Sequence, residues 1–134
     1  MSQESVELVR RIYEEGLLDG DPARFLDEFA VSGIEYVNPP EAVDAGIRRG
    51  PTEVAHAMRN TSEFFDSSRH ELHELFDRGD TVVAAVSFRT RSRGSETEVV
   101  QEEAHTWTLR NGRVARFEWG RDLATALEAA GLRE

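Results

Sequence analysis

The chain contains neither cysteine nor lysine, and both absences limit what it can do. Without cysteine it forms no disulfide and offers no thiolate for catalysis or metal binding, and every one of its 16 basic residues is arginine. The 26 acidic residues outnumber them and give a net charge of -10. Because such a surface repels phosphate groups, we expect neither nucleic acid nor an anionic membrane as a partner.

Long apolar runs are also missing. No stretch reaches the roughly 18 apolar residues that a membrane-spanning helix needs, and the N-terminus lacks the basic-then-apolar pattern of a signal peptide. We therefore expect a cytoplasmic protein. With 134 residues and no repeat, low-complexity tract or linker, the chain is predicted to form one domain over residues 1–134.

Apolar periodicity and turn residues predict the order of the secondary-structure elements. Asp21-Pro22 and Gly50-Pro51 are helix starts, and Asn111-Gly112 is the strongest hairpin signal in the sequence. In chain order we expect helices at 6–18 and 22–29, a strand at 34–38, a helix at 51–66, strands at 70–76, 81–91, 98–110 and 113–120, and a helix at 122–131. This order predicts an α+β fold in which a curved antiparallel sheet wraps over helices.

Four short segments give the sequence a family resemblance. They are the Gly20-Asp21 break, the strand end at Asn38-Pro39, "RRGPTEV" before the third helix and "HTWTLRNGRV" before the last strand. In this order and spacing the chain resembles the nuclear transport factor 2-like superfamily, and more narrowly SnoaL-like proteins and ketosteroid isomerase. The resemblance implies a cone-shaped sheet around an apolar cavity, commonly in a homodimer. The superfamily includes isomerases, cyclases, epoxide hydrolases, dehydratases and binding modules, so the fold does not define the function.

Three positions can be carried over from ketosteroid isomerase. Tyr13 matches the family's oxyanion-binding tyrosine, Asn38 its aspartate base, and His105 its second oxyanion donor. An amide cannot take up a proton at neutral pH, so the usual isomerase mechanism is not implied. The acidic residue of SnoaL-like cyclases aligns with Trp119, and the aspartate–arginine–aspartate cluster of limonene epoxide hydrolase has no clear match. Asn38 is either an orienting group in the pocket or only a turn-former before proline.

Alternation along the strand at 98–110 places Glu103, His105 and Trp107 on one face. If this face lines a cavity, His105 can act as general acid or base, with Tyr13 and Asn38 polarising a carbonyl group. The alternative is a hydrogen-bonded histidine in a half-buried strand. We expect burial to keep the ring neutral and His105 to be the only pocket group that titrates near neutral pH.

The predicted ligand is a small apolar molecule with a carbonyl or hydroxyl group, handled without a cofactor by an isomerase- or cyclase-like enzyme. The alternative is a binding module for an apolar ligand or a protein partner. We expect Asn38 and His105 to be the polar points of an apolar pocket. Its predicted lining comprises Tyr13, Phe29, Tyr36, Met58, Phe65, Val86, Phe88, Glu103, Trp107, Phe117 and Trp119.

No metal site is predicted, because His70 and His73, three apart on a strand, point to opposite faces. We also expect a homodimer through the outer face of the sheet, where alternation leaves an apolar set. This set comprises Val37, Val83, Ala85 and Val114.

Overall fold

Helices form where the sequence supplies caps and apolar stripes. In the computed structural model, which describes residues 2–132, the helices are α1 (Ser2–Glu14), α2 (Pro22–Phe29), α3 (Gly50–Phe64) and α4 (Leu123–Ala129). Asp21 caps α2 by accepting a hydrogen bond from the Ala23 amide, and Asp122 caps α4 in the same way through Ala124. The helices expected from the sequence are therefore present; the first begins and ends four residues earlier than expected, and the ends of the others differ by at most two residues.

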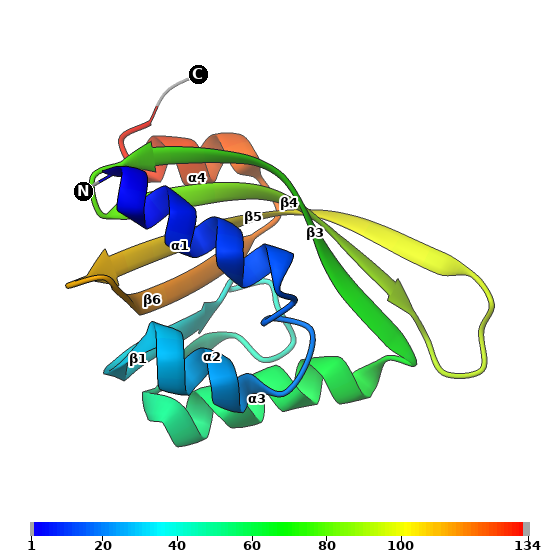
Figure 1. Cartoon of the computed structure of the whole chain (residues 1–134). Coiled ribbons are helices and arrows are strands. Elements are labelled where there is room, and N and C mark those ends of the chain that lie inside the picture. The colour runs from blue at the N-terminus through cyan, green and yellow to red at the C-terminus, as the bar shows by residue number, and fades with distance from the viewer. Residues whose placement is uncertain (1, 133–134) are drawn as a thin grey trace.

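The strands form a single curled, open sheet with the order β2-β1-β6-β5-β4-β3 (Figure 1). They are β1 (Ala30–Asn38), β2 (Gly46–Arg49), β3 (Ser67–Arg78), β4 (Thr81–Arg91), β5 (Glu98–Arg110) and β6 (Arg113–Gly120). Four neighbouring pairs are antiparallel, whereas β1 and β6 run parallel. The α+β fold is thus confirmed, with one parallel pair and the short β2 added to the expected arrangement.

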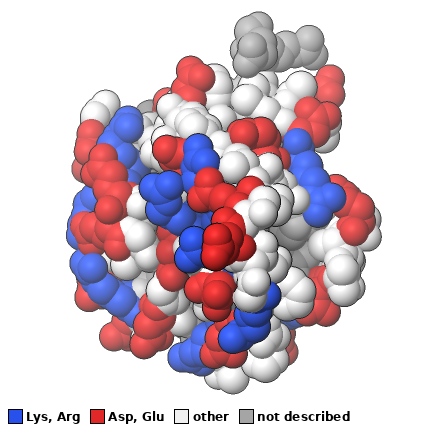
Figure 2. Space-filling model, turned by 90° about the vertical axis from the view of Figure 1, so that its right-hand side faces the viewer, with Lys and Arg blue, Asp and Glu red and all other residues white. Residues whose placement is uncertain are grey.

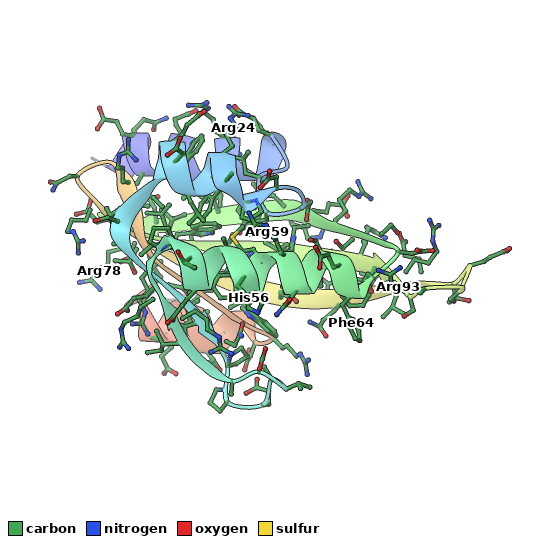
Figure 3. The ribbon with its side chains drawn as sticks, turned by 90° about the horizontal axis from the view of Figure 1, so that it is seen from below. Arg24, His56, Arg59, Phe64, Arg78 and Arg93 are labelled. Carbon is green, nitrogen blue, oxygen red and sulfur yellow. The ribbon has the colours of Figure 1, made fainter. Side chains whose placement is uncertain are left out.

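The two faces of the sheet are covered by different helices. Side chains of α1, α2 and α3 pack with the inner face in one apolar core, whereas α4 contacts β4 and β5. Figures 1 and 3 show α4 on the side of the sheet opposite to α1 and α2. Among the described residues, no helix is long and apolar enough to cross a membrane.

Two bulges change which side chains face inward. In β3 the register shifts between Leu72 and Glu74, so His73 is the extra residue of that strand. A second shift, between Thr108 and Leu109, turns Val114 of β6 into the main core, where it is fully buried. The assignment of Val114 to the outer face was therefore wrong, because simple alternation does not continue through a bulge.

The outer face has less apolar surface than alternation suggests. Val83 is fully buried within the single chain, and Val37 is 9% exposed. The homodimer itself stays a prediction.

Charges of both signs lie side by side at the far end of the β4–β5 hairpin, on the face shown in Figure 2. Arg89 forms ion pairs with Glu71 and Glu98, and Arg93 donates to the main-chain oxygen of Glu63. Arg89 and Arg93 of this hairpin thus have acidic or main-chain partners.

Candidate functional site

A chain of buried hydrogen bonds joins α1 to β5. The indole N–H of Trp107 donates to Tyr13 Oη at 2.9 Å, and Tyr13 Oη lies 2.6 Å from His105 Nδ1. An indole nitrogen can only donate, so Tyr13 accepts from Trp107 and has its own proton available for His105. The T-shaped contact between the Tyr13 and Trp107 rings holds the hydroxyl group in this position.

The chain continues from His105 to Glu103. His105 Nε2 lies 2.8 Å from Glu103 Oε1, and Gln101 Nε2 donates to Glu103 Oε2 at 2.6 Å. A carboxylate can only accept, so we place the proton of the His105 ring on Nε2 and the lone pair on Nδ1. The hydrogen bonds then all donate in one direction, from Trp107 through Tyr13 and His105 to Glu103. We call these residues, with Gln101, the hydrogen-bond chain.

Burial sets the protonation state of this hydrogen-bond chain. His105 is fully buried, and desolvation lowers its pKa below the ordinary value of 6.5, although the hydrogen bond to Glu103 acts in the opposite direction. Desolvation likewise raises the pKa of Tyr13 well above its ordinary value of 10.0. The lowered pKa of His105 agrees with the expectation that burial keeps its ring neutral.

This pKa shift predicts a loss of stability in acid. Below about pH 6.5 the unfolded His105 takes up a proton while the folded ring resists protonation, so acid favours the unfolded state. The free energy of unfolding should fall as the pH is lowered from 6.5 toward the depressed folded pKa. Urea unfolding at a series of pH values measures this slope, and His105→Gln should reduce it. Parallel curves for the two proteins would contradict the assignment.

A second histidine lies beside His105. The His70 and His105 ring centroids are 5.4 Å apart, and the His70 ring stacks on Phe88 at 4.2 Å. His70 Nδ1 is 2.6 Å from Asp19 Oδ1, and the main-chain N–H of His70 also donates to this carboxylate. His70 therefore faces the same interior as His105, a position that the sequence did not predict.

The other histidine of β3 points elsewhere. His73 Nε2 lies 2.6 Å from Ser87 Oγ, and Ser87 donates to Glu102. Because the serine proton is used by the carboxylate, this group lacks the arrangement of an activated serine nucleophile. The prediction that His70 and His73 point to opposite faces is confirmed.

Asn38 lies on the inner face of β1, at the edge of the core. Its Oδ1 accepts from Trp119 Nε1 at 2.6 Å, and its Nδ2 donates to the main-chain oxygen of Asp44 at 2.7 Å. Asn38 therefore joins the last strand to the 39–45 loop. The turn-only interpretation does not account for these bonds, but both functional ends of the amide are already engaged.

These contacts give Asn38→Asp a defined cost. A carboxylate can still accept from Trp119, but it loses the donor to Asp44 and places an oxygen against that carbonyl group. We expect the free energy of unfolding to fall by about 1–3 kcal/mol. Urea unfolding measures the loss, and Asn60→Asp on the exposed side of α3 is the matched control. Equal stabilities of the two variants would show that the Asp44 contact contributes little.

The predicted lining residues lie in or beside the core. Tyr36 packs on Phe117 at 5.2 Å between ring centroids, and Phe65 packs on Phe88 at 5.9 Å. Burial raises the pKa of Tyr36 to about 12; the charge of Glu103 acts in the same direction, and a hydrogen bond with Thr61 acts against it. Phe29, Met58 and Val86 also belong to this core, whereas the half-buried Phe65 lies outside it, against Phe88. The apolar pocket itself stays a prediction.

A hollow of about 390 Å³ lies between α2 and α3, away from the hydrogen-bond chain. It opens to solvent, and Figure 3 labels Arg24 of α2 and Arg59 of α3, the two helices that form it. Its lining consists of Ala23, Leu26, Asp27, Pro51, Thr52, Ala55 and Arg59. It contains no residue of the hydrogen-bond chain, so we do not assign the acid–base site to it.

Similarity to known proteins agrees with the fold. The family model of the SnoaL-like domain matches residues 9–117. The chain belongs to the SnoaL-like domain family. No curated protein matches the sequence.

Solved structures with a similar fold have low sequence identity to this chain. A putative SnoaL-like polyketide cyclase from Jannaschia sp. CCS1 has a TM-score of 0.76 and 19% identity, covering 99% of this chain and 95% of its own. TerC, co-crystallised with polyporic acid, has a TM-score of 0.75 and 22% identity, with 95% and 97% covered. A hypothetical protein from Catenulispora acidiphila DSM 44928 with a ketosteroid isomerase-like fold, in complex with trimethylamine, has a TM-score of 0.73 and 15% identity, with 94% and 93% covered. At these identities the similarity supports the fold alone.

Proposed function

We propose that the protein binds a small, largely apolar molecule with a carbonyl or hydroxyl group and moves a proton on it with its own side chains. The observation that supports this most strongly is the fully buried His105 ring, hydrogen-bonded to Tyr13 through Nδ1 and to Glu103 through Nε2. A histidine with a donor on one nitrogen and an acceptor at the other can pass a proton along this line without rotating. The description of a structural neighbour as a putative polyketide cyclase is consistent with such chemistry.

In this proposal the ligand meets Glu103. Glu103 is slightly more exposed than His105, at 7% against 0%, and the half-buried Gln101 donates a hydrogen bond to it. The carboxylate can receive a proton from the ligand while His105 stabilises its charge through Nε2–H. The charge of Glu103 helps to raise the pKa of Tyr36, and in this proposal the Tyr36 hydroxyl group donates to a ligand oxygen and polarises it.

Asn38 has a different role in this proposal from the one expected from the sequence. Its amide is engaged by Trp119 and by the main chain of Asp44, so it holds the 39–45 loop to β6. It is not offered as the group that polarises the ligand.

The second candidate is a binding module that holds the same kind of molecule without changing it. The amide of Asn38 at the position of the isomerase base favours this alternative, because it cannot accept a proton.

Proton exchange separates the two candidates. A panel of apolar cyclic ketones, such as 2-tetralone, is incubated with the protein in deuterated water, and loss of the α-proton signals is followed by NMR. The proposed enzyme exchanges these protons faster than buffer alone. Saturable binding of the ketones without faster exchange would support the binding module and contradict the enzyme.

A further inference from the structure

Three potential metal ligands from two strands converge in the interior. His70 of β3 and Glu103 and His105 of β5 each offer one ligand atom, and these atoms all lie within 4.8 Å of one another. Strand β4 separates β3 from β5, so the three side chains meet because the sheet curls around them. Two imidazoles and one carboxylate are a donor set that zinc and other divalent transition metals use, with further positions left open.

Each of the three ligands also has a partner that holds it in place. Asp19 binds Nδ1 of His70, Tyr13 binds Nδ1 of His105, and Gln101 binds the second oxygen of Glu103. Because a carboxylate only accepts, Asp19 keeps the His70 proton on Nδ1 and leaves the Nε2 lone pair free. Metal-ligating histidines almost always have such a partner on the other ring nitrogen.

The set is buried, unlike a chance group of acidic side chains at the surface. The side chains of His105, Glu103 and His70 are 1%, 5% and 12% exposed. Zinc–ligand bonds of about 2.0–2.2 Å in a tetrahedral site hold the ligand atoms about 3.3–3.6 Å apart. His105 Nε2 and Glu103 Oε1, which are now 2.8 Å apart, would therefore separate slightly, and His70 would adjust its position to complete the set. His70, the most exposed of the three and the only one outside the hydrogen-bond chain, is the ligand best able to move.

We propose that His70, Glu103 and His105 bind one divalent transition-metal ion of the zinc type. His105 would bind the ion through Nε2 and carry its ring proton on Nδ1, donating it to Tyr13 Oη. The imidazole ring keeps one proton, which moves from Nε2 to Nδ1, and Glu103 neither gains nor loses a proton, so protons and charge balance. The ion replaces the hydrogen bond between His105 and Glu103, so it competes with the proposed proton transfer. The partner of His70 is thus His105 of another strand, not the neighbouring His73 considered from the sequence.

Metal titration tests this proposal without any substrate. Protein without a histidine tag is stripped with a chelator and titrated with Zn²⁺ by calorimetry and with Co²⁺ by visible absorption. We expect one ion per chain. Asp19→Asn should weaken binding by about 10–100-fold, and His70→Gln should weaken it at least as much. His73→Gln and His56→Gln are the matched controls and should bind as the unaltered chain does, since His56 lies on the exposed side of α3 (Figure 3).

Circular dichroism establishes that each variant is folded, and Asp19→Asn carries the test if His70→Gln does not fold. No saturable binding of Zn²⁺ or Co²⁺ to the unaltered chain would overturn the proposal. Equal weakening by His73→Gln or His56→Gln would also overturn it. The outcome is independent of the proposed reaction: ketone exchange measured in the presence of chelator tests the reaction alone.

Discussion

His105→Ala should slow the exchange of ketone α-protons by about a hundredfold or more, the usual contribution of a proton-transfer group. The substitution removes the acceptor for Tyr13 and the donor to Glu103 in one step. Glu103 then loses the neighbour that stabilises its charge, and the path along the hydrogen-bond chain is interrupted. NMR of the ketone in deuterated water measures the rate.

A comparison of ketone binding with exchange rate separates proton transfer from a structural role. His105→Gln retains hydrogen-bonding capacity but cannot titrate, so it should lose exchange activity while it still binds the ketone. His56→Ala is the surface control and should leave the rate unchanged, because His56 is exposed on α3. If His105→Gln leaves both ketone affinity and exchange rate unchanged, His105 is structural and the catalytic proposal fails.

Trp107→Ala should lower the free energy of unfolding by about 3–5 kcal/mol, the usual cost of removing a large buried aromatic side chain. Trp107 is fully buried, and its ring contacts Tyr13, Phe25 and Phe117. The change opens a cavity where α1 and α2 meet the sheet and leaves Tyr13 without its donor. Urea unfolding measures the loss.

Two other substitutions provide a scale for the loss of stability expected from Trp107→Ala. Phe64→Ala removes a ring that is 73% exposed, so it should change stability by no more than about 0.5 kcal/mol. Trp107→Phe keeps an aromatic ring but loses the N–H donor. Its loss in free energy of unfolding should therefore lie between the losses for Phe64→Ala and Trp107→Ala. A loss below about 1 kcal/mol for Trp107→Ala would contradict the assignment of Trp107 to the centre of the core.

Most of the fold could be predicted from local signals. Asp21 and Asp122 act as caps, and glycine-containing turns separate the long strands, so chain order alone indicated an α+β sheet over helices. The short strand β2 was missed because Gly46–Arg49 is polar and its pairing with β1 depends on contacts across the loop. The position of Val114 was missed because a bulge reverses alternation, and no sequence signal marked this bulge.

The candidate site was likewise predicted in part from the sequence and missed in part. Alternation on β5 correctly grouped Glu103, His105 and Trp107, and the helical stripe correctly turned Tyr13 inward. The pair of Asp19 and His70 was missed. These two residues lie 51 positions apart, and their contact requires the loop after α1 to meet the start of β3. An inward direction for His70 follows from its register with Phe88, which the sequence does not reveal.

The central claim is that a neutral His105, with its proton on Nε2, faces the ligand site through Glu103. Long-range ¹H–¹⁵N NMR of the four histidine rings, assigned with His→Gln variants and recorded with and without 2-tetralone, tests this most directly. The account predicts a neutral Nε2–H ring for His105 at pH 7. It also predicts that the ketone shifts the signals of His105 and His70 but leaves those of His56 and His73 unchanged. A protonated His105, or a bound ketone that leaves the His105 signals unmoved, would contradict it.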